Sequence, residues 1–324
     1  MNVTRPEGLS RVRALLGVRR RRYEAVVLLH SVFSNGRLLY GELYRAIARS
    51  SSVKAYFIGN EYKLMPEKMD FCEELGVHLL VSMTSNPRVH DLYRARIGCQ
   101  VVAIPSAGID PAVFFPAVPL SARTIDLGYR AYAEPLYLGY QERTALAEHF
   151  SEGARRQGLV VDVSLDPAAR FERAEYAAFL NRCVGQLGSE AGTDYFDLED
   201  STRKRVNEYL ARRPSAGLDE LYAQILDRVE RLPARMISGR QSEAAATKTV
   251  QLLFEGEYSG VFRADVHYIA LKKDFSNVEE ALDRFRDDAT RRDVTESAYL
   301  VALEELSYGR LIDRFHAALE PLLR

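Results

Sequence analysis

The sequence has no tryptophan, only three cysteines and no hydrophobic run that approaches the about 20 residues of a membrane-spanning helix. No transmembrane segment is therefore expected. No two of Cys72, Cys99 and Cys183 have the spacing of a metal site, and so few cysteines fit a reducing cytoplasm. Lysine plus arginine number 44 against 45 acidic residues, so the overall charge gives no case for nucleic-acid binding. There is no Asp-x-Asp motif and no His/Cys cluster, which leaves metal binding without support.

The composition is that of a globular protein, with 324 residues of which 47% are hydrophobic and 27% charged. This length suits two domains of ordinary size. Basic residues gather near the start, where Arg19 to Arg22 form an uninterrupted run. One interpretation is a solvated helix end; the other is peripheral contact with an anionic membrane surface or a polyprenyl-phosphate acceptor. The first residues lack the apolar core of a signal peptide, so we expect a cytoplasmic protein, with the membrane surface as the alternative place.

In the first third of the chain, short apolar runs alternate with helical patterns. Such alternation implies a parallel sheet with crossover connections. The segment 105–120 is rich in proline and alanine and is expected to link two domains. The expected strands are 25–29, 53–58, 77–82 and 101–104, and the expected helices are 36–49, 65–75 and 87–96.

The rest of the chain is expected to form a second α/β domain. Its first strand, 124–127, meets Gly128-Tyr129-Arg130, and 186–192 is expected to be a polar, glycine-rich connection. The predicted division is a first domain at 1–116, a second at 117–307, and a final amphipathic helix at 308–324. The other expected strands are 159–163, 250–254 and 266–271, and the other helices are 144–157, 174–181, 200–212, 218–232, 241–247, 277–288 and 294–306.

Residues 235–277 combine several signals of secondary structure in a short stretch of sequence. Glu243 is expected in the first turn of a short alanine-rich helix. An acid there is either stabilised by the helix dipole or accepts hydrogen bonds from the hydroxyls of a ribose. A short apolar run at 250–254 has the length of a buried strand. The turn 255–260 follows with two glycines, at the carboxyl end of a strand, where open α/β sheets bind ligands.

This order of features resembles the donor-binding half of retaining glycosyltransferases of the GT-B fold, above all the family 4 and spore-maturation-type groups. In those proteins a glutamate followed by alanine opens a helix and holds the donor ribose. A strand and a glycine loop near the donor phosphates come next, and Glu243-Ala244, 250–254 and 256–260 match this order. The resemblance implies an α/β fold with two Rossmann-like domains facing a cleft, and a C-terminal helix that crosses back to the first domain.

The resemblance also implies an activity. The protein would move a sugar from a nucleotide-diphospho-sugar donor to an acceptor that is a saccharide, a lipid-linked molecule or a small molecule. Retention of the anomeric configuration is implied as well, and no metal ion or cofactor is expected. Two other functions stay open, namely a catalytically inactive glycosyltransferase-like binding protein and another sugar-nucleotide enzyme such as an epimerase.

Site residues in the second domain follow from the same pattern. Arg130 and Arg240 are expected to stabilise the negative charge that grows on the leaving diphosphate, and Arg143 can stand in for a lysine of the family that is missing here. Glu190 is a third catalytic candidate, near the sugar hydroxyls. Surface ion pairs and a plain tight turn are the structural alternatives. The donor-binding candidates are Glu243, Gly256, Glu257, Tyr258, Ser259, Gly260 and Arg143.

In the first domain, His30 and the pair Asn60-Glu61 follow expected strands and are candidates for the acceptor side, with a loop or capping role as the alternative. One departure from the family bears on mechanism. The family tends to carry a further glutamate eight positions before the ribose glutamate, and that position is Arg235 here. If no carboxylate nucleophile exists, stabilisation of the leaving group must lower much of the barrier.

Overall fold

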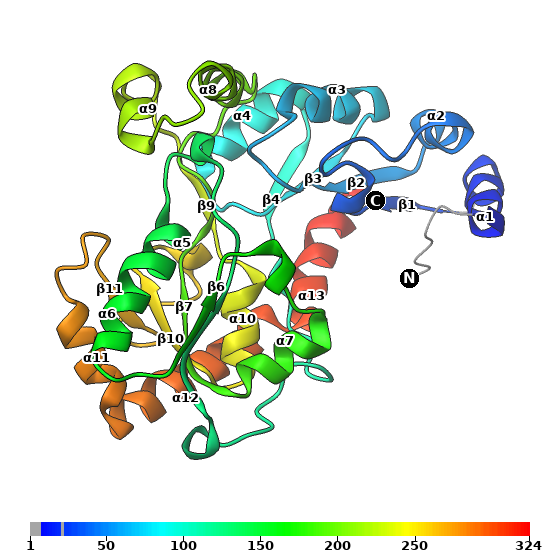
Figure 1. The fold of residues 1–324 in the computed structure, drawn as a ribbon. Coiled ribbons are helices and arrows are strands. Elements are labelled where there is room, and N and C mark those ends of the chain that lie inside the picture. The colour runs from blue at the N-terminus through cyan, green and yellow to red at the C-terminus, as the bar shows by residue number, and fades with distance from the viewer. Residues whose placement is uncertain (1–7, 21–22) are drawn as a thin grey trace.

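The computed structural model describes residues 8–20 and 23–324, which form two halves, each built around a parallel sheet (Figure 1). The upper half in Figure 1 holds the blue and cyan elements and the lower half most of the green to orange ones. The first helix, α1 (Gly8–Arg19), packs on α2 (Gly41–Arg49). Arg21 and Arg22 of the basic run lie outside the described residues. Within the described ranges, no helix has both the length and the apolar character needed to cross a bilayer.

The first sheet has four parallel strands in sequence order, β1-β2-β3-β4. Right-handed crossovers that always move in one direction place their helices on the same face of a sheet. On that face, Tyr56 and Leu80 of the sheet share a buried cluster with Phe71 and Val89 of the helices. The elements are β1 (Ala25–Leu28), β2 (Val53–Phe57), α3 (Met65–Leu75), β3 (Leu79–Ser82), α4 (Pro87–Ile97) and β4 (Gln100–Ala103).

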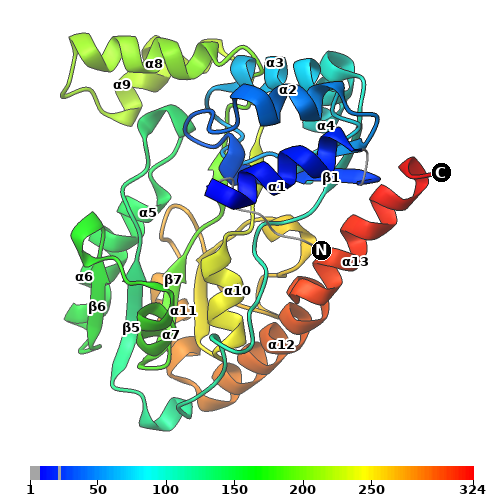
Figure 2. The ribbon, with the colours of Figure 1, turned by 90° about the vertical axis from the view of Figure 1, so that its right-hand side faces the viewer.

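The last helix, α13 (Tyr308–Leu319), covers the opposite face of this sheet. Because side chains alternate along a strand, the residues beside Tyr56 and Leu80 point to that face. The ring of Phe315 lies 5.0 Å from the ring of Phe57. Figure 2 shows α12 and α13 running up the side of the molecule, from the second half to the first. The buried cluster consists of Ala55, Leu79, Val81, Ile104, Leu311, Phe315 and Leu319.

The second sheet has the strand order β11-β10-β7-β5-β6, all parallel. From β5 the chain moves to β6 on one side, then returns past β5 to β7 on the other, so its helices cover both faces. A π-helical turn joins α5 to α6. The elements are β5 (Ile125–Arg130), α5 (Glu142–Ala145), α6 (Ser151–Arg156), β6 (Val161–Ser164), α7 (Arg173–Leu180), β7 (Cys183–Gly188), α10 (Gly239–Ala246), β10 (Val250–Phe254), β11 (Ile269–Leu271), α11 (Val278–Arg286) and α12 (Asp288–Leu306).

Between β7 and α10 the chain leaves the second sheet and packs on the first half (Figure 1). Phe196 and Leu232 join the core of the first half, where the ring of Phe196 meets that of Tyr93 edge-on at 5.4 Å. Asp200 Oδ2 accepts a hydrogen bond from the Leu64 N–H at 3.0 Å. This segment therefore ties the halves together, as α13 does. It contains β8 (Ala191–Thr193), α8 (Ser201–Arg212), α9 (Leu218–Gln224) and β9 (Ala234–Met236).

The helix at 65–75 and the strand at 250–254 have the predicted bounds. Other elements differ at their ends; for example, the helix expected at 36–49 begins only at Gly41. Residues 128–130, expected to follow a strand, are the last residues of β5.

The connection predicted at 186–192 is wrong, because its first part is the end of a fully buried strand, β7. The glycines of this strand leave room for the side chains that pack against it. A Cβ at Gly185 would lie 2.7 Å from the ring of Phe285, and one at Gly188 would lie 2.8 Å from Leu253. Glycine in a central strand thus allows close approach of neighbouring side chains, whereas in the sequence it looked like a loop signal.

Phe315→Ala should lower the free energy of unfolding by about 3 kcal/mol, because deletion of a buried ring removes its contacts and leaves a cavity. Phe315 is 5% exposed, whereas Ile312 on the same helix is 51% exposed. The control Ile312→Ala should therefore change the free energy by less than about 0.5 kcal/mol. Chemical denaturation of both variants is the measurement, and equal effects would contradict the packing of α13 on the first sheet.

Candidate functional site

The second sheet reverses its direction of winding between β5 and β7, and at such a point the loops after the two strands diverge. Arg130 ends β5, and Ser189-Glu190 follow β7. Beside them stand the first residues of α5 and α10, which carry Arg143 and Arg240. Five of the predicted site residues therefore lie at the carboxyl edge of the second sheet, namely Arg130, Arg143, Glu190, Arg240 and Glu243.

Helix α10 begins with a capping box in which Ser238 and Gln241 satisfy each other's backbone N–H groups. The Glu243 carboxylate, one turn on, has no hydrogen-bond or ion-pair partner among the described residues. Burial raises the pKa of Glu243 to about 7, although the cations of Arg240 and Arg173 lower it. A part-buried carboxylate without a partner is free to accept hydrogen bonds from a ligand.

Two arginines at this edge, the buried Arg143 and the half-buried Arg240, have buried nitrogen atoms without a partner. Among the described residues, these are Nε and Nη1 of Arg143 and Nε of Arg240, and the hydroxyl of Tyr129 beside them is also unpaired. The Arg143 guanidinium lies 4.8 Å from the ring centre of Tyr132, and the Arg240 guanidinium 6.0 Å from that of Tyr129. Buried donors normally have partners, so their absence here calls for a ligand rich in acceptor oxygens.

Glu190 fastens the glycine turn. Its Oε1 accepts a hydrogen bond from the Tyr258 N–H at 2.7 Å, and a Cβ at Gly256 would lie 2.6 Å from its Oε2. Burial raises the pKa of the Glu190 carboxyl, although the Tyr258 N–H lowers it. Three successive residues of the turn have positive φ, namely Tyr258, Ser259 and Gly260 at 42°, 56° and 75°. The carboxylate thus holds the turn in a strained left-handed path.

The side chains of Tyr258 and Ser259 in this turn form hydrogen bonds within the protein. The Tyr258 hydroxyl donates to the Phe254 carbonyl at 2.6 Å, and Ser259 Oγ accepts from the Ile237 N–H at 3.1 Å. Tyr258 is fully buried, so neither side chain is a free polar group as the sequence suggested. Gly256, Glu257 and Gly260 are exposed, which leaves the backbone of the turn as its accessible part.

Arg130 is directed away from this group. Its Nη2 forms an ion pair with Asp162 at 2.7 Å, and its guanidinium lies 4.4 Å from the ring centre of Phe179 and 5.0 Å from that of Phe171. Its Nε is buried without a partner in the described part of the chain. The Arg130 carbonyl accepts from Arg240 Nη1 at 3.4 Å. Alternation along β5 turns the side chain of Arg130 toward α7, and only its backbone reaches Arg240.

Arg235, at the position of the missing glutamate, is locked in a network of charges. Its Nε lies 2.6 Å from Asp194, its Nη1 lies 3.2 Å from Glu142, and its guanidinium lies 3.5 Å from the ring centre of Tyr140. Lys273 also contacts Glu142, at 2.8 Å. Although burial lowers the pKa of Arg235, the two carboxylates raise it above its usual value. Arg235 therefore joins α5 to the β8–β9 pair and offers no carboxylate.

The predicted acceptor-side residues lie at the carboxyl edge of the first sheet. His30 is exposed and packs against Gly59, where a Cβ would come within 2.9 Å of it. Asn60 has a positive φ of 49° and donates from Nδ2 to Ser34 Oγ and Asn35 Oδ1, each at 2.9 Å. Both residues can reach a ligand at this edge.

Glu61 differs from these two, because it is completely buried. Its carboxylate accepts from the Ser82 hydroxyl, the Met83 N–H and the Tyr93 hydroxyl, each at 2.7 Å. Burial raises its pKa, although these bonds lower it. All of this fits a structural role for Glu61 in joining β2, β3 and α4, with no free oxygen for an acceptor.

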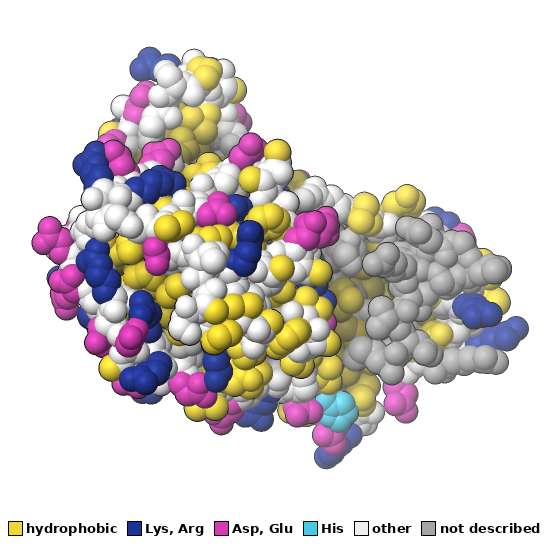
Figure 3. All heavy atoms as spheres, turned by 60° about the horizontal axis from the view of Figure 1, so that its bottom comes forward, with side chains coloured by type: hydrophobic (Ala, Val, Ile, Leu, Met, Phe, Trp, Pro, Cys, Tyr) yellow, Lys and Arg dark blue, Asp and Glu magenta, His cyan; other side chains and the backbone are white. Residues whose placement is uncertain are grey.

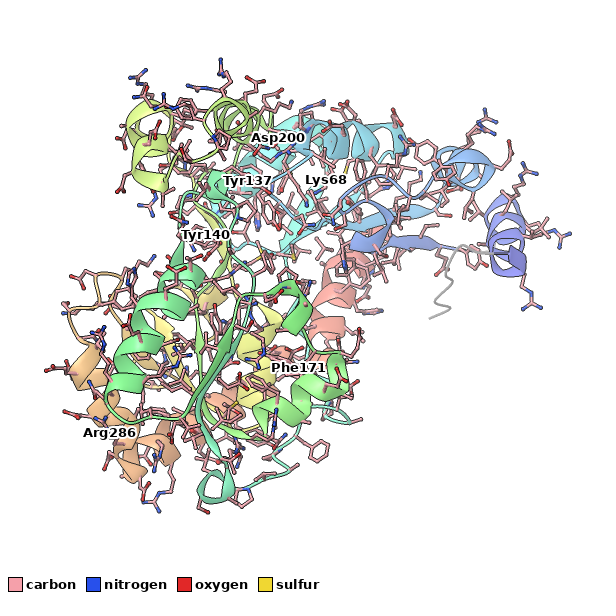
Figure 4. The ribbon with its side chains drawn as sticks, viewed as in Figure 1. Lys68, Tyr137, Tyr140, Phe171, Asp200 and Arg286 are labelled. Carbon is pink, nitrogen blue, oxygen red and sulfur yellow. The ribbon has the colours of Figure 1, made fainter. Side chains whose placement is uncertain are left out.

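Sequence reasoning did not single out the tyrosines at this boundary. Tyr132, Tyr137 and Tyr140 lie on the connection from β5 to α5; Figure 4 labels Tyr137 and Tyr140, where this connection passes between the two halves. The spacing of four tyrosines between 129 and 140 was a visible signal.

A recess of about 600 Å³ between the linker residues 116–120 and α12 lies away from this edge. The face of the second half that points away from the first mixes basic, acidic and hydrophobic side chains (Figure 3).

No family model and no curated protein sequence matches the chain. Solved structures do. Sucrose-phosphate synthase from Thermosynechococcus elongatus matches with a TM-score of 0.51 at 9% identity, over 97% of this chain and 77% of that one. A mutant of S. aureus TarM, in complex with Fondaparinux, alpha-GlcNAc-glycerol and UDP, matches with a TM-score of 0.51 at 8% identity, over 94% of this chain and 57% of that one.

A UDP-forming alpha,alpha-trehalose-phosphate synthase from Burkholderia xenovorans matches with a TM-score of 0.49 at 15% identity, over 97% of this chain and 78% of that one. At such identities the likeness concerns the fold. The structural neighbours are GT-B glycosyltransferases, and the predicted α/β architecture of two Rossmann-like halves with a returning C-terminal helix is confirmed. The bounds of the domains, and a closer affiliation with family 4 or the spore-maturation-type group, stay predictions.

Arg235→Met should lower the free energy of unfolding by about 3 kcal/mol, because it leaves the buried carboxylates of Glu142 and Asp194 without their shared cation. The control is Arg231→Met, which removes a 60% exposed partner of Asp194. An exposed ion pair contributes little, so the control should cost less than about 1 kcal/mol. Denaturation midpoints measure both, and a stable Arg235→Met protein would show that Arg235 does not hold this network.

Proposed function

We propose that the protein is a glycosyltransferase that moves a sugar from a nucleotide-diphospho-sugar to an acceptor bound between its halves. One observation carries the proposal. An unpartnered carboxylate, Glu243, and unpaired guanidinium nitrogens of Arg143 and Arg240 gather at the point where the second sheet reverses direction. A nucleoside diphosphate has both a ribose diol, which donates hydrogen bonds, and phosphate oxygens, which accept them. The two kinds of unsatisfied group match these two parts.

In this proposal the donor sugar is released by cleavage of its bond to the diphosphate oxygen, which takes the electron pair. Arg143 and Arg240 are placed to stabilise that charge, together with N–H groups at the start of α10. The acceptor oxygen then forms the new bond to the sugar carbon, and its proton passes to the oxygen of the leaving diphosphate. Arg130 supports Arg240 through its carbonyl. Retention of configuration and independence from metal ions belong to the proposal, on the strength of the resemblance.

The acceptor is proposed to approach from the first half, near His30 and Asn60. A saccharide, a lipid-linked molecule and a small molecule all remain acceptor classes. Peripheral membrane contact through the basic run stays a prediction. Of that run, Arg19 is exposed and forms an ion pair with Glu42 at 2.6 Å, while Arg21 and Arg22 lie outside the described residues.

One observation favours the second candidate, a binding protein without catalysis. Arg235 fills the place of the missing acid, and its three nitrogen groups are taken by Asp194 and Glu142. Release of nucleoside diphosphate from the donor, with and without acceptors, separates the two functions. Analysis of the sugar product separates an epimerase from both.

Glu243→Gln should remove a pH dependence of donor affinity. The pKa of Glu243 in the free protein is raised to about 7, and ribose hydroxyls donate to the ionised form. Affinity of the wild type should therefore fall about tenfold from pH 8 to pH 6, as the carboxylate gains a proton. Titration calorimetry measures this with the nucleotide-sugar that stabilises the protein most in a thermal-shift screen. A nucleotide-sugar is used because its diphosphate does not titrate in this range.

The ligand-free protein supplies a second readout. The folded pKa of Glu243 lies above its unfolded value of 4.5, so the ionised carboxylate destabilises the folded state above pH 7 and has no such effect below pH 4.5. Glu243→Gln should therefore stabilise the fold at pH 8, and the gain should fade as the pH falls. A wild-type affinity that is flat from pH 6 to pH 8 would contradict the ribose assignment.

Arg143→Met should weaken binding of the nucleotide-sugar about tenfold or more, because loss of a charged hydrogen bond costs about 1.5–3 kcal/mol. Arg130→Met should weaken it less, since Asp162 already neutralises that guanidinium. Arg143→Lys should rescue only partly, because it keeps the charge and loses the planar fork. Affinities and turnover of the three variants are compared; a larger loss with Arg130→Met would assign the diphosphate to Arg130 instead.

A further inference from the structure

The recess between the linker residues 116–120 and α12 lies at the amino edge of the second sheet, opposite to the edge that carries Glu243. Figure 2 shows the linker beside α12 at the lower end of the second half. The linker supplies an apolar wall, and the polar side chains of the recess come from Arg123, from Lys248 and from α12. Its volume of about 600 Å³ and its mostly apolar lining with a few polar groups are typical of sites for small molecules.

Arg123 is a buried cation on this recess, and none of its partners is a carboxylate. It is 9% exposed, and its guanidinium donates to the carbonyls of residues 118, 180, 183 and 247 and to the Thr249 hydroxyl. Nη2 donates only to the Thr247 carbonyl, at 2.7 Å, so one of its two N–H groups is left for a ligand. Burial lowers the pKa of Arg123 to about 10, although the neighbouring Cys183 raises it. A buried cation without a counter-ion is stabilised by an anion beside it.

Thr295 of α12 supplies a second unsatisfied group to the same recess. It is 4% exposed, and its hydroxyl has no hydrogen-bond partner in the part of the chain that the structure describes. A threonine inside a helix can donate to the carbonyl one turn back, and buried hydroxyls normally have a partner. The hydroxyl of Thr295 is therefore available to donate to a ligand oxygen.

The other charged side chains around the recess leave a small positive excess. Lys248 Nζ lies 2.6 Å from a carboxylate oxygen of Glu296, so these two charges compensate each other. Arg292 and Asp293 are exposed neighbours on α12, and Arg123 is the remaining cation. Three cations and two carboxylates thus line the recess, which leaves one positive charge in excess.

We propose that this recess binds a small amphipathic monoanion, a carboxylate on an apolar body. The linker residues 116–120 cover the body, and Arg123 and Thr295 bind the carboxylate. The site is separate from the proposed donor edge and does not depend on the proposed glycosyltransferase activity.

The charges and the shape of the recess select this class of ligand. A single carboxylate matches the one positive charge in excess, whereas a diphosphate would bring further charges against Asp293 and Glu296. An uncharged apolar molecule would leave Arg123 without a counter-ion. A small anion without an apolar body would leave the linker wall exposed to water.

The test measures binding of octanoate to the full chain by saturation-transfer NMR, with two probes that each lack one half of the chemistry. Octan-1-ol keeps the apolar body without the charge, and acetate keeps the charge without the body. Each should bind at least about tenfold more weakly than octanoate. Hydrogen exchange locates the site, and octanoate should slow exchange in peptides that cover 116–124 and 290–297.

Variants on α12 assign the contacts. Thr295→Val removes the hydroxyl at nearly constant shape and should weaken octanoate binding about threefold, without loss of stability because that hydroxyl has no partner in the protein. Arg292→Met removes a rim charge and should also weaken it about threefold. Ser297→Ala is the control, because Ser297 is on the same helix and does not line the recess. Arg123 itself is left unchanged, since its donors join four segments of the chain.

Loss of affinity in Thr295→Val and Arg292→Met, with Ser297→Ala unchanged and all three unfolding midpoints as in the wild type, supports the site. No binding of octanoate, or affinity that neither variant lowers, overturns the proposal. Octan-1-ol or acetate that binds as tightly as octanoate overturns it as well, because the ligand class is then wrong. Protection by octanoate that lies only outside 116–124 and 290–297 also contradicts it.

Discussion

One face of the first sheet is left uncovered by the helices that connect its own strands, and this is the constraint on which the rest of the structure depends. Its four strands follow one another in sequence order, so right-handed crossovers put α2, α3 and α4 on one face only. The other face is as apolar as a sheet interior and needs a cover, which α13 supplies with Leu311, Phe315 and Leu319. Because α13 comes at the end of the second half, closing the first core also fixes how the halves meet.

That attachment brings two carboxyl edges together. Residues after β3 of the first sheet contact the segment before α10, where Asn86 Nδ2 donates to the Pro233 carbonyl at 2.7 Å and Thr84 Oγ1 to the Arg235 carbonyl at 3.3 Å. The segment between β7 and α10 packs on the first core as well. The second sheet is wound in both directions and needs no such cover. Its reversal point instead provides the edge where unsatisfied groups collect.

The arginines at that edge are distinguished by their partners. Arg130 and Arg235 face carboxylates and contribute to the framework. Arg143 and Arg240 face tyrosine rings and carbonyls, so their charge stays available. Charge alone does not identify a binding residue in this protein. The partner that each guanidinium already has decides between framework and site.

This distinction explains what the sequence could and could not reveal. Glu243 was found because its short helix, the following strand and the glycine turn are local signals, and its carboxylate has no partner among the described residues. Its place in the first turn of the helix was predicted wrongly, because the helix begins earlier, at Gly239. The direction of Arg130 was missed because one residue more in a strand turns a side chain to the opposite face.

Other features depend on contacts between distant segments. Glu190 was singled out, but its bond to the Tyr258 N–H joins the loop after β7 to the turn after β10. The contact between the rings of Tyr62 and Tyr137 joins the two halves, and no sequence periodicity indicates it. The strand β7 was not recognised from the sequence, because its glycines looked like a loop signal. Their role is to leave room for Phe285 and Leu253, and only the folded structure shows those neighbours.

The central claim is that a nucleotide-sugar binds at the carboxyl edge of the second sheet, against Arg143, Arg240 and Glu243. Hydrogen exchange with and without the nucleotide-sugar tests it most directly. The account predicts slower exchange in peptides that cover 130–145 and 238–247, with the outer strands of the first sheet unchanged. Protection confined to the first half, or to the recess between 116–120 and α12, would contradict it.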